Sequence, residues 1–281
     1  MQQQETAILD RYGLLGYPVG HSKSPIIHRL FAEQTDQAMS YELVEVRPEK
    51  LDDMVRAFQR NGGRGLNVTV PHKADVTRLV DELSEAASIA GAVNTLDMRD
   101  NHIVGHNTDG IGLVRDLTQN WQFDIAGKRI LIFGAGGAAQ GIIAPLFEHE
   151  PALITIANRT VAKADALANH FGTLGNVNAT RFADIRDGSE PYDLVINATS
   201  AGLGGEDAPF PRAAVSNRHT ACYDLSYSLN TTPFIVWAQK VDAQRTRSGW
   251  GMLLEQAAEP LRLWRGVMPD THAVIKRLPV N

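Results

Sequence analysis

A glycine turn between two apolar segments constrains the fold of this 281-residue chain more than any other feature. The run RILIF is typical of a buried strand, GAGGAA follows it, and QGIIAPLFEH is typical of a helix. Gly134 allows a tight turn, Gly136 lets the backbone approach a pyrophosphate, and Ala139 takes the small position where helix packs on strand. An ordinary βα turn is the alternative. The next strand, ALITIA, follows in the right order and favours a Rossmann-type dinucleotide site, with phosphates at the helix N-terminus.

The end of that second strand indicates which dinucleotide the site takes. An NAD site usually has Asp or Glu there, to bind the ribose hydroxyls. This chain has Asn158, Arg159 and Thr160 instead, with Lys163 one helical turn later. A carboxylate would repel a 2′-phosphate, whereas these side chains would bind one. Arg159 alone would be interpreted as a solvated loop cation; together with the missing acid, it favours NADP.

The first hundred residues alternate between strand-like and helix-like patterns. We predict strands over residues 12–19, 41–46 and 65–70 and helices over 25–34, 51–59 and 72–83, followed by a hairpin over 93–104 with its turn at Asp100 and Asn101. A helix follows GHNTDG, and further strands lie in DLVINAT and ACYDL. The prediction is an α/β protein of two domains. An N-terminal α/β substrate domain has a mostly parallel sheet, and a Rossmann-type domain binds NADP.

Composition excludes several kinds of partner. With 43% hydrophobic residues and a net charge of −5, the chain can bury a full core and has no basic character for nucleic acid or anionic membranes. The uncharged run over 130–147 contains glycines and a proline and divides into strand, turn and helix, so we do not interpret it as a transmembrane segment. MQQQETAILD lacks the pattern of a signal peptide, and the single Cys222 fits a reducing compartment as a buried, inert thiol. We expect a cytoplasmic protein.

The segment GHSKSPIIH places two hydroxyls, Ser22 and Ser24, just before a predicted helix. Ser24 could cap that helix, with Ser22 as a turn residue. Other polar groups also follow predicted strands, and ligands in open α/β sheets bind beyond the carboxyl ends of strands. These hydroxyl, amide, ammonium and carboxylate groups suit a small polyhydroxylated acid; they come from NVTVPHK, GAVNT and GHNTDG and are Thr69, Lys73, Asn94 and Asp109.

Taken together, these motifs resemble the shikimate dehydrogenase family. GHSKSPIIH, NVTVPHK, GAVNT, GHNTDG, GAGGAA, NRT, INATSAG and GMLLEQA occur in the family's order and cover nearly the whole chain. The resemblance implies reversible, NADPH-dependent reduction of 3-dehydroshikimate to shikimate in aromatic biosynthesis. It also implies a discontinuous substrate domain, 1–108 plus 246–281, a Rossmann domain over 109–245, and a catalytic cleft between them.

The resemblance assigns roles to individual residues. Lys73 and Asp109 would form the catalytic pair that relays a proton while hydride passes from nicotinamide; an exposed structural ion pair is the alternative if the other motifs are set aside. The substrate carboxylate would contact Ser22, Ser24 and Tyr227, and the ring hydroxyls would contact Thr69, Lys73, Asn94, Asp109 and Gln256. The cofactor would be lined by Gly134, Ala135, Gly136, Gly137, Ala138, Asn158, Arg159, Thr160, Lys163, Leu225 and Gly249.

Two departures from the family pattern stand out. His106 replaces a common Asp before NTD, where we expect only an effect at the rim, and Leu229 replaces a proline after the family's DxxY, near Tyr227. His102 and His106 are four apart, but Gly105 and the hairpin argue against one helical face, so we predict no metal site. His72 is interpreted as a polar residue at a strand end.

Two alternative functions remain open at this stage. One is a quinate or dual quinate/shikimate dehydrogenase, which NAD preference would favour. The other is a non-catalytic NADP- or metabolite-binding regulator on the same fold. The expected partner is the small-molecule substrate, for a monomer or homodimer that binds neither nucleic acid nor membrane.

Overall fold

The computed structural model describes residues 9–186, 190–199, 201 and 210–278 of the chain. These residues form two compact units. Residues 9–108 with Gln256–Leu278 make the first unit, and Asp109–Glu255 make the second. The family resemblance implies a return to the first unit at residue 246; the compact units divide at Gln256, inside helix α8 (Trp250–Arg265).

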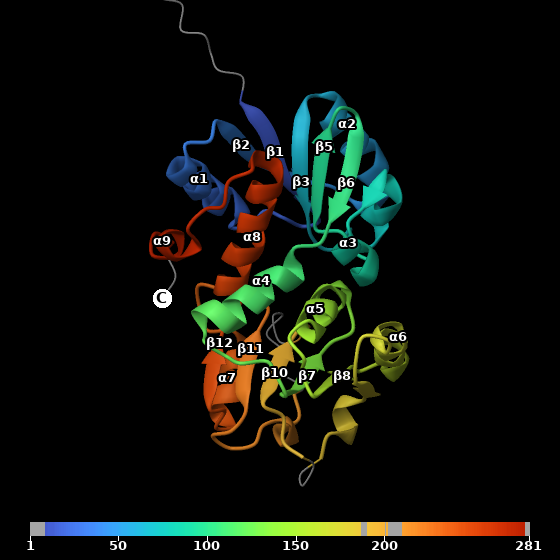
Figure 1. Ribbon diagram of the computed structural model, residues 1–281, viewed down its shortest axis with the longest axis vertical. Coiled ribbons are helices and arrows are strands. Elements are labelled where there is room, and N and C mark those ends of the chain that lie inside the picture. The colour runs from blue at the N-terminus through green and yellow to red at the C-terminus, as the bar shows by residue number, and fades with distance from the viewer. Residues whose placement is uncertain (1–8, 187–189, 200, 202–209, 279–281) are drawn as a thin grey trace, which may run out of the picture. The chain divides into compact units, whose positions relative to one another are not determined.

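A six-stranded mixed sheet forms the centre of the first unit, in the order β2-β1-β3-β5-β6-β4 (Figure 1). Strand β1 (Asp10–Gly16) pairs in parallel with both β2 (Met39–Glu45) and β3 (Gly63–Val68). Strands β5 (Thr95–Arg99) and β6 (His102–His106) form the predicted hairpin, and β3 pairs antiparallel with β5. Asp100 and Asn101 have positive φ of 49° and 61°, which their short polar side chains tolerate in a tight turn.

The helices of the first unit are α1 (Ser24–Thr35), α2 (Leu51–Arg60), α3 (Glu85–Ala90), α9 (Thr271–Ile275) and the C-terminal part of α8. A short 3₁₀ turn, Pro48–Lys50, precedes α2. The sequence signals predict α1 and α2 but not α3 or α9.

The prediction of a helix over residues 72–83 is wrong. Only Asp75–Leu79 is helical, as a 3₁₀ turn, and Glu82–Leu83 form strand β4 beside β6. In an α-helix, the carbonyl of Lys73 would accept a hydrogen bond from the backbone N–H four residues later. Here it accepts a 2.7 Å hydrogen bond from the N–H of Val93 instead. Tertiary bonding thus replaces the helical pattern that the sequence suggests.

The second unit is a fully parallel six-stranded sheet in the order β12-β11-β10-β7-β8-β9 (Figure 1). Its strands are β7 (Arg129–Phe133), β8 (Leu153–Ala157), β9 (Val177–Thr180), β10 (Leu194–Asn197), β11 (Ala221–Asp224) and β12 (Arg245–Arg247). Its helices are α4 (Asp109–Arg115), which continues as a π-helical turn over Asp116–Asn120, α5 (Gly137–Phe147), α6 (Val161–Phe171), α7 (Pro233–Lys240), and 3₁₀ turns at Phe182–Asp184 and Arg212–Ala214. The two edge strands and α7 are absent from the sequence prediction.

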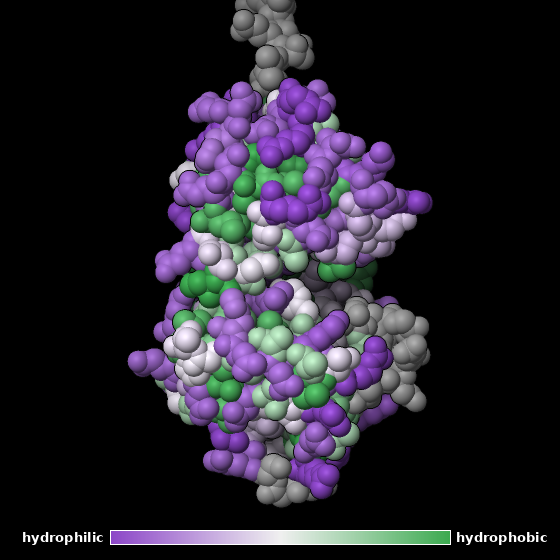
Figure 2. Space-filling model, turned by 90° about the vertical axis from the view of Figure 1, so that its right-hand side faces the viewer, coloured by the Kyte–Doolittle hydropathy of each residue, from purple (hydrophilic) through white to green (hydrophobic). Residues whose placement is uncertain are grey.

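Each unit has its own apolar core, whereas the face in Figure 2 is mostly hydrophilic with hydrophobic residues in small groups. In the first unit, Leu15, Leu66 and Leu96 are fully buried. In the second, Phe133 packs with Cys222, and burial raises the pKa of the Cys222 thiol to about 12. Cys222 is therefore a buried thiol rather than a nucleophile, as predicted. In the part of the chain that the structure describes, no helix combines the length and the hydropathy of a membrane span.

His28 is an unusual member of the first unit's interior. The residue is 1% exposed, and its ring stacks on Tyr41, with the centroids 4.0 Å apart and an angle of 8° between the planes. Neither ring nitrogen has a hydrogen-bond partner among the described residues. Burial lowers the pKa of His28 to about 3, and the nearby Asn67 side chain offsets part of that shift. The folded protein therefore keeps this ring neutral.

This burial makes stability depend on pH in a defined direction. The unfolded chain binds a proton at His28 below its ordinary pKa, while the folded chain does not until about pH 3. We expect the free energy of unfolding of the wild type, relative to His28→Phe, to fall by about 1.4 kcal/mol per pH unit between about pH 6 and pH 4. Urea denaturation of both proteins at several pH values measures this difference. A difference that does not change with pH would contradict the assignment of a neutral, buried His28.

Candidate active site

The serine pair lies at the start of α1, after strand β1. Ser22 Oγ donates to Ser24 Oγ at 3.2 Å and accepts from the backbone N–H of Ser24 at 3.2 Å. The alternative in which Ser24 caps the helix does not hold: Lys23 is the N-cap residue and makes no side-chain cap, while Ser24 is already in the first turn. The geometry therefore gathers two hydroxyls at the positive end of a twelve-residue helix, a suitable place for a carboxylate.

The loop after β3 carries Thr69 and Lys73. The N–H of Thr69 bonds to the carbonyl of Leu15 at 2.8 Å, which fixes this loop to the end of β1. The Thr69 side chain lies so close to Gly16 that a Cβ there would come within 2.4 Å of its methyl group, so only glycine fits. The buried ring of His72 bonds to the carbonyl of Val46 at 2.7 Å, as expected for a polar residue at a strand end.

Asn94 and Gln256, 162 residues apart, lie together in the first unit. Asn94 is 3% exposed; its Nδ2 donates to Thr108 Oγ1 at 3.0 Å and to Gln256 Oε1 at 3.5 Å. Its Oδ1 accepts from the N–H of Thr108 at 2.9 Å. The carbonyl of Asn94 also accepts from Val68 at 2.7 Å, which places it at the carboxyl end of β3. Two predicted substrate residues are thus neighbours.

Asp109 is the first residue of α4 and of the second unit, and it is 5% exposed. The residue before it, Thr108, is the one that contacts Asn94 and Gln256. The catalytic pairing of Asp109 with Lys73 stays a prediction. Among the described residues, no cluster of His, Cys, Asp and Glu could hold a metal ion.

The glycine turn of the second unit has open space where a pyrophosphate would lie. Gly134 has φ of +108°, and a Cβ there would lie 2.9 Å from the carbonyl oxygen of Ala198, so glycine is required. Apart from chain neighbours and the helix's own backbone, no heavy atom of the described residues lies within 4 Å of a Cβ placed on Gly136 or Gly137. Gly136 is the N-cap of α5 and offers no side chain to its N–H groups. This geometry fits a dinucleotide, which would approach the bare backbone.

The residues after β8 fit a 2′-phosphate. Asn158 follows Ala157, the last residue of the strand, and its Nδ2 donates to the carbonyl of Thr160 at 2.9 Å. Arg159 and Lys163 are exposed, and neither has an ion pair within the part of the chain that the structure describes. No acidic side chain occupies this strand end. The cations thus remain available to a phosphate.

Leu225 and Gly249, both predicted to line the cofactor, are neighbours. A Cβ on Gly249 would lie 2.3 Å from the carbonyl oxygen of Leu225, so glycine alone permits the approach. Tyr227 packs against Trp250, with ring centroids 4.9 Å apart, and Leu229 is 50% exposed. The motif INATSAG is only partly visible, since Ser200 and Gly202 lie outside the described residues.

A polar cluster at the ends of β10 and β11 is not predicted by the sequence patterns. Asn197 Nδ2 donates to Asp224 Oδ1 at 3.0 Å, and Thr232 Oγ1 donates to Asp224 Oδ2 at 2.5 Å. Burial raises the pKa of Asp224, and the hydrogen bonds from Thr232 and Ser226 oppose that rise. The Asn of INAT and the Asp that ends ACYD were the available signals, but the sequence does not show that they meet.

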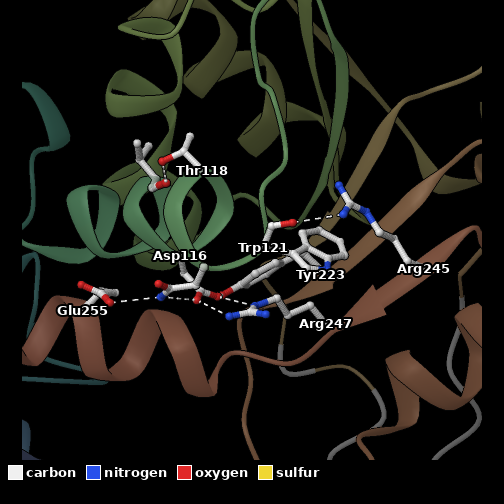
Figure 3. A network of polar contacts seen from close by, with 9 residues as sticks. Asp116, Thr118, Trp121, Tyr223, Arg245, Arg247 and Glu255 are labelled. Carbon is white, nitrogen blue, oxygen red and sulfur yellow. Dashed lines mark hydrogen bonds and ion pairs between the residues drawn. The ribbon is translucent and has the colours of Figure 1, made fainter. Parts of the chain in front are cut away.

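A second network of polar contacts, which the sequence patterns also do not predict, holds the segment that carries Gly249 (Figure 3). Asp116 is fully buried; Arg247 donates to both of its oxygens, at 2.8 and 2.6 Å, and Tyr223 donates at 2.6 Å. Asn120 links Asp116 to Glu255 of α8. A Cβ on Gly251 would lie 1.9 Å from Asp116 Oδ1, so glycine lets α8 start against the carboxylate. The network therefore positions residues 247–251.

Removing one partner of this buried ion pair should be costly. We expect Arg247→Met to lower the free energy of unfolding by about 3–5 kcal/mol, because it leaves Asp116 buried without its cation. Arg277→Met, which breaks an exposed pair with Glu33, is the matched control and should cost less than about 1 kcal/mol. Urea denaturation gives both values. Equal effects of the two changes would show that the Asp116 network does not stabilise the second unit.

The observations so far define a class of protein. A parallel sheet with a bare glycine turn, in a chain whose other α/β unit carries hydroxyls and amides at the ends of its strands, is typical of nucleotide-dependent oxidoreductases acting on small polar substrates. Comparison with known proteins narrows this class. Residues 14–96 match the shikimate dehydrogenase substrate binding domain, 116–204 match shikimate / quinate 5-dehydrogenase, and 249–278 match the shikimate 5′-dehydrogenase C-terminal domain. The chain belongs to the shikimate dehydrogenase family.

Individual relatives agree with this placement. A shikimate dehydrogenase (NADP(+)) of Methylococcus capsulatus is 49% identical over 96% of this chain and 96% of its own, and one of Chromobacterium violaceum is 47% identical over 96% and 97%. Among solved structures, an Ael1 enzyme from Pseudomonas putida is 39% identical, with a TM-score of 0.88 over 97% of this chain and 99% of that one. The Thermus thermophilus shikimate 5-dehydrogenase in complex with NADP(H) and shikimate is 31% identical, with a TM-score of 0.84 over 95% and 98%.

Proposed function

We propose that this protein is an NADP-dependent oxidoreductase that interconverts 3-dehydroshikimate and shikimate. The observation that carries the proposal is the polar set at the carboxyl ends of β1 and β3, in a chain whose second unit has an open glycine turn and a cationic strand end. The first set suits a carboxylate and ring hydroxyls, and the second suits a dinucleotide with a 2′-phosphate.

The residues divide the work between binding and proton transfer. Ser22 and Ser24 hold the substrate carboxylate at the start of α1, and Asn94 and Gln256 bind ring hydroxyls. When bound, NADPH supplies the hydride that reduces the ketone carbon. Lys73 stabilises the negative charge that develops on the ketone oxygen, and Lys73 with Asp109 delivers the proton that completes the alcohol. In the reverse direction the same pair removes the hydroxyl proton.

The first test is the absorbance of NADPH over time. Purified protein is given shikimate with NADP, and quinate and NAD are then substituted one at a time. Reduction of NADP to NADPH that requires shikimate, and that does not occur when quinate or NAD is substituted, supports the proposal. Quinate turnover of similar efficiency would indicate a dual-specificity enzyme. No turnover by folded protein that binds NADP would leave the regulator as the function.

Lys73→Ala should remove proton transfer without removing the cofactor site. We expect kcat to fall by about 10² to 10⁴, with KM for NADP unchanged, because general acid–base catalysis contributes about that much. Lys50→Ala is the control, since Lys50 is exposed in the same unit and forms a 3.9 Å surface pair with Asp53. A loss of about tenfold or less in the Lys73 variant would contradict its role.

Arg159→Ala tests the choice of cofactor. Losing a charged contact to the 2′-phosphate, worth about 1.5–3 kcal/mol, should raise KM for NADP by about tenfold or more and leave turnover with NAD unchanged. Lys240→Ala, an exposed cation at the end of α7, is the control. If the KM values for NADP and for NAD rise equally, Arg159 does not bind the 2′-phosphate that distinguishes the two cofactors.

Two further parts of the proposal concern the protein outside its site. We expect it to act in the cytoplasm, and we expect a monomer or homodimer. Size-exclusion chromatography with light scattering measures the second point.

A further inference from the structure

A continuous chain of side-chain hydrogen bonds crosses the interior of the first unit and ends at Asn94. Tyr41 OH donates to Asn67 Oδ1 at 2.7 Å, and Asn67 Nδ2 donates to Thr95 Oγ1 at 3.0 Å. Thr95 Oγ1 then donates to Asn94 Oδ1 at 3.0 Å. The sequence patterns assign no role to Tyr41, and Asn67 and Thr95 occur only as members of the motifs NVTVPHK and GAVNT.

Backbone groups determine the direction of this chain. The N–H of Thr108 can only donate, so the Asn94 atom that faces it at 2.9 Å must be Oδ1. The carbonyl of Asn94 can only accept, so the Asn67 atom that faces it at 3.4 Å must be Nδ2. The Thr95 hydroxyl lies between an amide donor and an amide acceptor, and it can satisfy both only by accepting from Asn67 and donating to Asn94.

The chain is also rigid. Asn67 is 6% exposed, and Thr95 is fully buried in β5. Tyr41 is held by the His28 ring stacked on it at 4.0 Å. A reversed Asn94 amide would place its NH₂ group against the N–H of Thr108 and against the Thr95 hydroxyl proton, leaving buried donors unpaired.

We infer that Tyr41, Asn67 and Thr95 are positioning residues, which hold the Asn94 amide so that its Nδ2, rather than its Oδ1, faces Gln256 and the substrate. The inference rests on the proposed function, because it concerns a residue assigned to the substrate ring. It adds a specificity rule: the oxygen that meets Asn94 must act as a hydrogen-bond acceptor.

The experiment compares Thr95→Val with Thr95→Ser. Valine keeps the shape but loses the hydroxyl, whereas serine keeps the hydroxyl. We expect Thr95→Val to lower kcat/KM for shikimate by about tenfold, through KM for shikimate, with KM for NADP within about twofold of wild type, because misplaced binding groups weaken the productive complex. Thr95→Ser should recover to within about twofold of wild type.

Two further measurements separate positioning from a general loss of structure. Tyr41→Phe keeps the stack on His28 and should lower kcat/KM in the same direction by a smaller factor, so it serves if Thr95→Val does not fold. Thr155→Val, which removes a buried hydroxyl from β8 in the other unit, is the matched control and should leave KM for shikimate unchanged. In an Asn94→Ala background, Thr95→Val should have no further effect on KM for shikimate.

Each outcome bears on the inference. Wild-type kinetics in both Thr95→Val and Tyr41→Phe, a serine variant as impaired as the valine one, or a full Thr95→Val effect in the Asn94→Ala background would overturn it. If the wild type binds shikimate without turning it over, the proposed function fails, and titration calorimetry of shikimate into the same variants still decides the inference by the same ratios. If the wild type does not bind shikimate, both are overturned.

Discussion

Backbone hydrogen bonds between neighbouring loops hold the predicted substrate residues of the first unit together. The N–H of Thr69 bonds to Leu15, that of Tyr17 bonds to Val70, and that of Val68 bonds to Asn94. The first two bonds extend the parallel pairing of β1 with β3, which brings the carboxyl ends of both strands to one edge, and the third extends the antiparallel pairing of β3 with β5. The hydroxyls of Ser22, Ser24 and Thr69, which are predicted to bind substrate, follow the two strands that meet at that edge.

The second unit depends on close backbone approaches in the same way. Gly134 lies against Ala198, Gly249 against Leu225, and Gly251 against the buried Asp116 carboxylate. Arg247 and Tyr223 keep Asp116 in place, so an ion pair in the interior sets where helix α8 begins. A larger residue at Gly134 or Gly249 would displace backbone, and one at Gly251 would displace the buried Asp116 carboxylate.

Much of the fold can be predicted from local patterns. The run RILIF-GAGGAA predicts a strand, a bare turn and a helix because its signals lie within a few residues, and β7, α5 and β8 occur as expected. The prediction for residues 72–83 is wrong for the opposite reason, since the structure of this segment depends on residues far away in the sequence. Its composition is compatible with a helix, but the bond from Val93 to Lys73 and the ring of His72 on Val46 are made by distant residues and favour a 3₁₀ turn. Strands β9 and β12 are short strands at the edges of the second sheet. They are identified by their pairing with neighbouring strands and not by a pattern in the sequence.

The sequence by itself determined which chemical groups the predicted site contains, since SKSP, NVTVPHK, GHNTDG and NRT supply its hydroxyls, its cations and the missing acid after β8. Only the tertiary structure decided how those groups are oriented. The amide of Asn94 faces Gln256 because Thr108, Thr95, Asn67 and Tyr41 come from separate elements and meet only in the folded unit. Hydrogen-bond direction depends on which donor lies next to which acceptor, and no spacing along the chain encodes that.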